Sequence, residues 1–156
     1  ATDPADAIIF DPCASTGVAA PGATPEQRAA LDAAIGLWNA AGVGAFVDAG
    51  DSAGDSAGDS ASDIHGAITV EFRSAAPSIY GFYDADAATV YINTDLADPD
   101  ERAVTIAHEL GHALGLEHVA RDERVSVMNP GNLTVVPAGG DVAALATLWG
   151  ACAQTN

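Results

Sequence analysis

Apolar residues recur at helical spacing over residues 24–42 and predict the first helix of the chain. Residues 24–27 (TPEQ) have the form of a capping box with proline at the first helical position, and Gly42 is suited to end the helix. The apolar face carries Leu31, Ile35 and Trp38. We therefore expect Trp38 in the core.

Four short segments predict β-strands. Residues 67–72 (AITVEF) alternate apolar and polar side chains, as half-buried strands do. Residues 43–47, 78–83 and 89–93 are further short segments rich in aromatic or β-branched residues. The sequence DADAA separates the last two segments and predicts a turn.

Two more helices are expected downstream. Asp98 caps the first of them, with proline at the next position, and this helix runs to Gly115. After an irregular segment, Asp141 caps a last helix (DVAALATLW) that ends at Gly150, and Trp149 lies on its apolar face. The order of helix, strands, helix, irregular segment and helix predicts one α+β domain over residues 1–156.

Two stretches lack the periodic apolar residues that would predict a helix or strand packed in a core. Residues 1–23 form a lead punctuated by proline and glycine, and residues 50–63 repeat GDSA and predict an acidic surface loop. The aspartates of the repeat could ligate calcium. The loop lacks the glycine and the final glutamate at the positions that an EF-hand requires, so a solvated loop is favoured. His65 is expected to be a solvated loop histidine.

The strongly acidic composition of the chain restricts the molecules that it can bind. The chain has 22 Asp and Glu against five Arg and no Lys, for a formal net charge of −17. Nucleic acid and anionic membranes are therefore poor partners, and solubility explains the charge better than high salt or bound cations. No run of eighteen apolar residues and no signal-peptide pattern occurs, so we expect no membrane span, and any leader would have been removed.

The two cysteines, Cys13 and Cys152, lie near the two ends of the chain. Because chain termini often lie close together, we expect one disulfide. It would stabilise the fold by roughly 4 to 5 kcal/mol in the chain-entropy model and would indicate an oxidising, extracellular compartment. The alternative is two unpaired buried thiols.

The candidate chemistry lies in HELGHALGLEH, residues 108–118. On a helix, His112 lies about 40° around the axis from His108 and one turn along, so both imidazoles share a face. A continuing helix would carry His118 some 15 Å from His108 along the axis, so the helix must end between them. Gly115 supplies the break, since glycine adopts the left-handed conformation at little cost.

Three neutral imidazoles brought together in this way predict a site for one Zn²⁺ with an open fourth position for water. Glu109 points beside the metal, where a general base would accept a proton from the zinc-bound water. The metal would polarise the water and the substrate carbonyl, and the carboxylate would pass the proton to the leaving amine. The pattern therefore predicts hydrolysis of an amide bond.

These residues match the H-E-x-x-H-x-x-G-x-x-H signature of metzincin metallopeptidases, and their sequence most resembles that of the matrixins and their bacterial relatives. Met128 in SVMNP corresponds to the family's methionine turn, and DVAALATLWG resembles its C-terminal helix. The resemblance implies a zincin-like fold: a small twisted mixed sheet with an antiparallel edge strand, a backing helix, an active-site helix and a C-terminal helix. Neither the loop of the matrixin structural zinc nor the propeptide cysteine motif is found.

The resemblance also implies roles for particular residues. His108, His112 and His118 would bind zinc, Glu109 would be the general base, and Met128 would pack beneath the metal. Residues 78–83 would form the edge strand that binds an extended substrate antiparallel to itself, and residues 129–137 would wall a pocket for an apolar side chain after the cut bond. The expected substrate-binding residues are Ser78, Ile79, Tyr80, Gly81, Phe82, Tyr83, Asn129 and Pro130.

Other side chains are weaker candidates. Tyr80, Tyr83 and Tyr91 could donate a hydrogen bond to an oxyanion, but packing in cross-strand pairs is favoured. Asp84 and Asp86 could bind calcium, but a plain turn is favoured.

The sequence thus predicts a secreted, monomeric zinc endopeptidase that cuts extended polypeptides. One alternative is a binding protein that keeps the metal site but does not cut, although the presence of Glu109 opposes it. The other is a zinc peptidase that acts on peptide ends or on a specialised amide. A cleft that is open at both ends of the edge strand would favour the endopeptidase.

Overall fold

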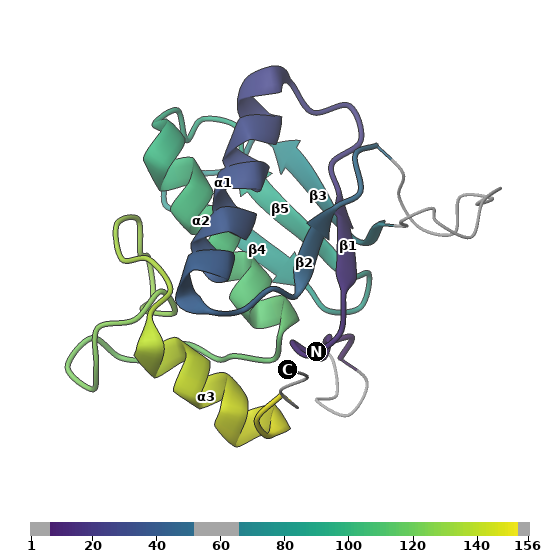
Figure 1. Cartoon of the computed structure of the whole chain (residues 1–156). Helices are drawn as coiled ribbons and strands as arrows, with labels where there is room; N and C mark the ends of the chain where they lie inside the picture. The colour runs from purple at the N-terminus through teal and green to yellow at the C-terminus, as the bar shows by residue number, and fades with distance from the viewer. Residues whose placement is uncertain (1–6, 52–65, 153–156) are drawn as a thin grey trace, which may run out of the picture.

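The computed structural model describes residues 7–51 and 66–152 of the 156-residue chain. In this part, α1 and α2 cover one face of a five-stranded sheet, and α3 lies below them (Figure 1). The elements in chain order are β1 (Thr16–Ala19), α1 (Pro25–Ala41), β2 (Phe46–Asp48), β3 (Gly66–Arg73), β4 (Gly81–Asp84), β5 (Thr89–Asn93), α2 (Pro99–Ala113) and α3 (Gly139–Trp149).

The sheet is mixed, with strand order β2-β1-β3-β5-β4. Every neighbouring pair is parallel except β4 and β5, which are antiparallel. β4 is therefore an antiparallel strand at one edge of the sheet, and its outer side has no partner strand in the described chain. This arrangement confirms the α+β class and the mixed sheet expected from the sequence.

β1 corrects the expectation that residues 1–23 form only an irregular lead. All four of its residues are buried, and it pairs with β2 on one side and β3 on the other. A strand buried on both faces shows no alternation of polar and apolar residues. Its small residues, TGVA, also lack the aromatic and branched side chains that usually mark a strand.

Two strands begin three residues later than their sequence patterns indicated. Val43 lies in the turn that closes the end of α1, because its N–H donates to the carbonyl of Trp38 at 2.9 Å, and β2 starts only at Phe46. Residues 78–80 form the approach to β4 rather than its first half. The side-chain amide of Asn93 holds this approach by donating to the carbonyls of residues 75, 76 and 79.

The three helices were expected, with one error at a helix start. Thr24 and Gln27 form the capping box of α1, and Asp98 caps α2. Asp141, however, does not precede α3 but lies inside its first turn, where its carboxylate accepts the N–H of Ala138 at 3.0 Å. The pair of glycines at 139–140 hid the true start, because glycine is a poor helix former.

The core lies between the helices and the sheet. Val70 of β3 and Val90 of β5 are register partners, and both belong to one buried cluster with Trp38 of α1 and Leu110 of α2. Trp38 is fully buried, as expected, and its indole N–H donates to the carbonyl of Ala107 at 3.0 Å. This bond fixes α2, which carries the candidate metal ligands, against α1.

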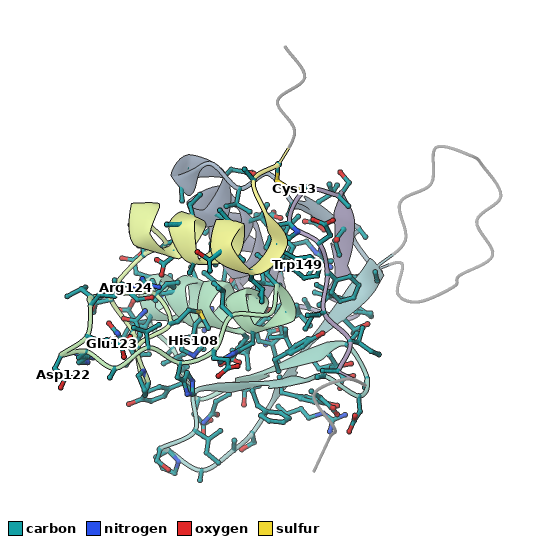
Figure 2. All side chains as sticks on the ribbon, turned by 90° about the horizontal axis from the view of Figure 1, so that it is seen from below. Cys13, His108, Asp122, Glu123, Arg124 and Trp149 are labelled. Atoms are coloured by element: carbon teal, nitrogen blue, oxygen red, sulfur yellow. A yellow bond between two sulfur atoms is a disulfide. The ribbon has the colours of Figure 1, made fainter. Side chains whose placement is uncertain are left out.

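A disulfide joins the two ends of the described chain. Cys13 and Cys152 are bonded across a sequence separation of 139 residues, which confirms the expected pairing. Figure 2 shows Cys13 and Trp149 on the same side of the molecule, near the end of α3. The indole N–H of Trp149 donates to the carbonyl of Leu114 at 2.7 Å. Together these links hold α3 against the end of α2.

None of the helices in residues 7–51 and 66–152 combines the length and apolar character needed to cross a membrane. The acidic repeat from residue 52 onward and His65 lie outside the described residues.

Candidate functional site

The three histidines of the sequence signature converge at the end of α2. His108 and His112 project from the helix, and His118 returns to them after the helix has ended. Each offers a ring nitrogen, and these atoms all lie within 4.8 Å of one another. His108 is buried, His112 is half-buried and His118 is exposed. The cluster is therefore accessible from one side.

Gly115 ends α2 in the way that the sequence predicted. It has a φ of 94°, in the left-handed region. The N–H of Gly115 donates to the carbonyl of His112, and the N–H of Leu116 donates to that of Gly111 at 3.0 Å. These two bonds form a Schellman motif, which reverses the chain after the helix. The reversal brings His118 back toward the histidines of the helix.

Backbone carbonyls orient two of the imidazoles. The Nδ1 of His108 lies 2.7 Å from the carbonyl oxygen of Val127, and the Nδ1 of His112 lies 2.8 Å from that of Leu116. Because a carbonyl can only accept, both Nδ1 atoms carry the proton and both Nε2 atoms present a lone pair. Leu116 lies in the same turn that redirects the chain, so one piece of backbone positions His118 and orients His112.

This donor set suits a metal ion. The Nε2 of His108, which has a lone pair, lies 3.2 Å from the Nε2 of His118. Imidazole nitrogens at about 2.0–2.1 Å from a tetrahedral zinc lie roughly 3.4 Å apart. The ring nitrogens here lie within 4.8 Å of one another, so the farthest pair would have to close by up to about 1.4 Å. Three imidazoles are a common ligand set for zinc. The three histidines can thus hold a metal ion.

Glu109 lies beside the histidines in a buried position, with 6% of its surface exposed. Gly81 of β4 allows the close approach of the edge strand, since a Cβ at that position would lie 3.1 Å from Cγ of Glu109. The backbone N–H of Tyr83, also in β4, donates to the Glu109 carboxylate. The edge strand therefore both encloses and orients this carboxylate.

Burial changes the protonation of the site in the metal-free protein. It raises the pKa of Glu109 to about 8, partly offset by the hydrogen bond from the Tyr83 N–H. Burial, with the neighbouring imidazoles, lowers the pKa of His112 to about 4, and it also lowers the pKa of His108. At neutral pH these two histidines are ready to bind a cation, while Glu109 holds a proton.

Met128 packs under the histidine face of α2. It is fully buried, and a Cβ at Gly111 would lie 2.5 Å from its Sδ and 3.4 Å from the Trp38 ring. Only glycine at position 111 leaves room for this sulfur between the two histidines of the helix. The backbone of Met128 also contributes, because its carbonyl accepts the N–H of Val119, the residue after His118, at 3.0 Å.

A buried hydrogen-bond chain runs from α3 to the Met128 turn. The Asp141 carboxylate, 1% exposed, accepts from the Ser126 hydroxyl and, at 2.9 Å, from the Arg124 guanidinium. The Ser126 oxygen in turn accepts the N–H of Met128 at 2.9 Å. Val127, which lies between Ser126 and Met128, supplies the carbonyl that orients His108. Asp141 is thus linked through the turn to the orientation of His108, which its prediction as a helix cap did not reveal.

Two cavities meet at Glu109 and His118. The loop-side cavity, of about 220 Å³, is lined by the approach to β4 and by the loop after Met128. The termini-side cavity, of about 560 Å³, continues along β4 in the other direction. The loop-side cavity is lined by Ser78, Ile79, Tyr80, Gly81, Thr105, His108, Glu109, His118, Gly131 and Asn132.

The expected substrate-binding residues therefore fall into two groups. Residues 78–83 of the edge segment line one or both cavities. Asn129 and Pro130 line neither. Asn129 is 1% exposed, and its amide group donates to the carbonyls of Val119 and Arg124, so it holds the turn together from within. A role for these two residues in substrate binding remains a prediction.

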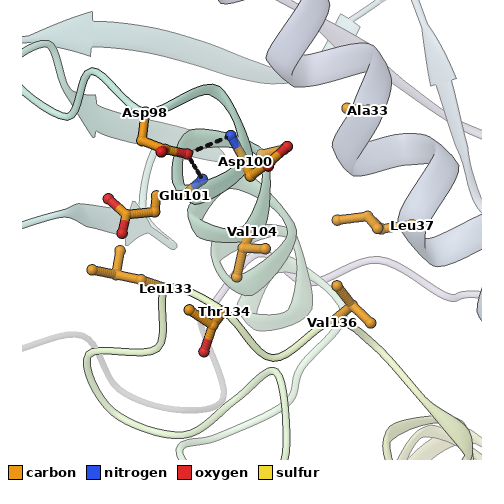
Figure 3. Close-up of a pocket in the computed structure, with 10 residues that line it drawn as sticks. Ala33, Leu37, Asp98, Asp100, Glu101, Val104, Leu133, Thr134 and Val136 are labelled. Carbon is orange, nitrogen blue, oxygen red and sulfur yellow. Dashed lines mark hydrogen bonds between the residues drawn. The ribbon is translucent and has the colours of Figure 1, made fainter.

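The loop over residues 129–137 separates the loop-side cavity from a third cavity behind it. This rear cavity, of about 470 Å³, lies between the loop, α1 and the start of α2. Figure 3 shows Leu133 and Val136 of the loop together with Leu37 of α1 around it. Asp98 accepts the N–H groups of Asp100 and Glu101 here, so its cap lies at the cavity wall.

The remaining candidates have mostly structural contacts. The Tyr83 hydroxyl donates to the carbonyl of Ile8, and Tyr91 stacks under the Arg73 guanidinium. The Asp84 carboxylate accepts the N–H of Asp86, as in the expected turn. Tyr80 differs, since it lines the loop-side cavity.

Two residues near the site, Thr105 and Asn93, were not identified from the sequence, whereas Asn132 lies within residues 129–137, which were expected to wall a pocket. Thr105 and Asn132 line the loop-side cavity, and Asn93 holds the approach to β4. Thr105 lies three residues before His108, and its place on the same helix face could have revealed it. Asn93 had no local signal, because its amide donates to carbonyl groups 14 to 18 residues away.

The chain was compared with known proteins. Residues 63–124 match the peptidase M78 family, described as the IrrE N-terminal-like domain. This match runs from before β3 to the loop after His118 and covers less than half of the chain. No curated protein sequence matches the chain.

Among solved structures, the fold is similar to a crystal structure of myroilysin. The TM-score is 0.59 at 17% identity, and the match covers 95% of this chain and 88% of that one. A second myroilysin structure gives a TM-score of 0.46 at 23% identity, over 71% of this chain and 52% of that one. At such identities, the first comparison shows a shared α+β fold.

The contact between Gly111 and Met128 can be tested by Gly111→Ala. The new Cβ would overlap the buried sulfur, and overpacking of this kind costs about 1–3 kcal/mol. Gly36→Ala is the matched control, since Gly36 lies inside α1 with open space around it and should gain about 0.5–1 kcal/mol. Urea unfolding of both variants should give changes of opposite sign. Equal stability of the two would contradict the packing of Met128.

The raised pKa of Glu109 predicts that zinc binding releases a proton. At pH 7 the metal-free carboxyl is protonated, and a nearby cation lowers its pKa, so the proton leaves on binding. Calorimetry in buffers of different ionisation enthalpy should find that Glu109→Gln releases nearly one proton less than the wild type. At pH 9, above the metal-free pKa, the difference should disappear. The same release from both chains at pH 7 would refute the prediction.

Proposed function

We propose that this chain is a zinc-dependent endopeptidase that hydrolyses internal bonds of extended polypeptides. The observation that carries the proposal is the convergence of His108, His112 and His118 beside the buried Glu109, at the meeting point of two cavities. The match to a peptidase family over residues 63–124 supports it, because this stretch contains all four residues.

The residues divide the chemistry between them. A zinc ion held by the three imidazoles would supply a Lewis acid that polarises water and the substrate carbonyl. Glu109 accepts a proton from the attacking water and delivers it to the nitrogen of the leaving amine. The Tyr83 N–H keeps the carboxylate directed to this task. Burial of Glu109 excludes bulk water and strengthens its interaction with nearby charge.

The shape of the cleft supports cutting within a chain. The unpaired edge of β4 can add an extended peptide as a further strand. The loop-side cavity lies at the start of β4 and the termini-side cavity along its length, so space for substrate exists on both sides of Glu109. An enzyme specialised for peptide ends would need a wall on one side.

The narrower assignment that we propose is a metzincin-type enzyme, similar to the matrixins. It is supported by the eleven-residue signature, by the reversal at Gly115 and by Met128 packed against Gly111. The matched family profile names a peptidase family but does not name the matrixins. We also propose that the protein is secreted, because its disulfide suits an oxidising compartment.

The decisive test is Glu109→Ala. The zinc-loaded wild type should cut quenched peptides and unstructured proteins, lose the activity with a chelator and regain it with zinc. The variant should bind zinc in the same ratio to the chain but cut at least about 100-fold more slowly, since it lacks the proton acceptor.

Glu123→Ala provides the matched control. Glu123 is exposed on the loop after His118 (Figure 2), so its loss should leave cutting unchanged. Equal cutting by wild type and Glu109→Ala would remove the assigned base. A wild type that binds zinc and cuts nothing would favour the alternative of a silent binding protein.

A further inference from the structure

The termini-side cavity has a wall that the proposed catalytic chemistry does not use. Three large apolar side chains on it are exposed: Ile9 at 41%, Phe82 at 58% and Leu148 at 52%. They come from the segment before β1, from β4 and from α3. Apolar residues scattered singly on a surface need no explanation, but several gathered in one cavity mark a binding site.

The two ends of the described chain are fixed where they form this wall. The N–H of Ile8 donates to the carbonyl of Ala85 at 2.9 Å, and the N–H of Phe10 donates to that of Ala113 at 2.8 Å. These bonds hold Ile9 between β4 and the end of α2. Leu148 is held by its neighbour Trp149, which is bonded to Leu114. The Cys13–Cys152 disulfide then joins both segments.

Gly115 brings this wall up to the metal site. A Cβ at Gly115 would lie 2.7 Å from Cδ2 of Leu148 and 3.2 Å from Cδ1 of Ile9. The absence of a side chain at Gly115 therefore lets the two apolar groups meet directly over the turn between His112 and His118. The same cavity is lined by Glu109 and His118, so an occupant of it lies next to the reacting bond.

The direction of the substrate follows from the direction of β4 together with the antiparallel strand addition that the resemblance to the matrixins implies. The strand runs from Gly81, which lines both cavities, to Asp84, and the termini-side cavity extends to Ala85. A peptide added antiparallel to β4 would run the opposite way. Its residues before the cut bond would lie over the termini-side cavity, and those after it over the loop-side cavity.

The charge of the protein limits the occupant. Glu117 lines the termini-side cavity, and the chain has a net charge of −17, so an acidic side chain would be repelled. An apolar side chain loses water on entering a wall of Ile, Phe and Leu, and it carries no charge for Glu117 to repel.

We propose that Ile9 and Leu148 determine specificity by binding an apolar side chain, such as Leu or Phe, at one of the three positions before the bond that is cut. This inference rests on the proposed endopeptidase function. It assigns a substrate-binding role to residues from both ends of the chain, outside the histidine signature.

The test uses the full zinc-loaded chain and a peptide library. The wild type should select Leu, Ile or Phe at one of the three positions before the cut. Ile9→Ala and Leu148→Ala should each lower kcat/KM at least about tenfold for a peptide with Leu there, and less than about twofold for the same peptide with Ala there. Val125→Ala is the control, since Val125 is 72% exposed and lines neither cavity.

Equal losses on the Leu and Ala peptides, or no loss in either variant, would overturn the inference. A preference that lies after the cut bond would overturn it as well. If the wild type cuts nothing, the proposed function fails, and fluorescence anisotropy with the zinc-loaded Glu109→Ala chain decides the inference instead. The inference is supported if this chain binds the Leu peptide more tightly than the Ala peptide and loses this difference when Leu148→Ala is added. Equal binding of the two peptides refutes the inference.

Discussion

The reversal of the chain at Gly115 is the constraint on which the rest of the site depends. Helical geometry can place two of the histidines on one face, but the third needs the chain to turn back. The Schellman motif at Gly115 provides this turn, and the carbonyl of Leu116 within it orients the ring of His112. Because Gly115 has no side chain, the same turn also accepts Ile9 and Leu148 above it. One glycine therefore positions the histidine cluster and the apolar wall beside it.

The other side of the site depends on a turn that is held by buried polar groups. Asp141 of α3 binds Ser126, Ser126 binds the backbone of Met128, and the carbonyl of Val127 orients His108. Each of these groups is buried, so a missing partner would leave an unpaired polar atom at a cost of about 1–3 kcal/mol. The carboxylate of Asp141 is thus linked to the orientation of His108 through three hydrogen bonds. α3 lies away from the sheet, yet it supports both the turn that orients His108 and the cavity wall that contains Leu148.

Much of this arrangement could be predicted from the sequence, because its signals are local. The three helices, the strand at residues 89–93 and the break at Gly115 follow from caps, periodicity and glycine chemistry. β1 could not be predicted, since a short strand of small residues buried on both faces has no alternation. The later start of β4 depends on Asn93, and the true position of Asp141 depends on Ser126 and Arg124, which are distant in sequence. The convergence of Ile9 and Leu148 likewise needs the fold, because the two residues lie at opposite ends of the chain.

The central claim is that three imidazoles meet at one cation beside Glu109. X-ray absorption spectroscopy of the zinc-loaded chain measures the ligands directly. We expect three imidazole nitrogens at about 2.0–2.1 Å from the zinc. We also expect His118→Ala to remove one of them and to weaken zinc binding. A zinc environment with two imidazoles that is unchanged in His118→Ala would show that the chain does not bring the third histidine to the metal, and would contradict the account.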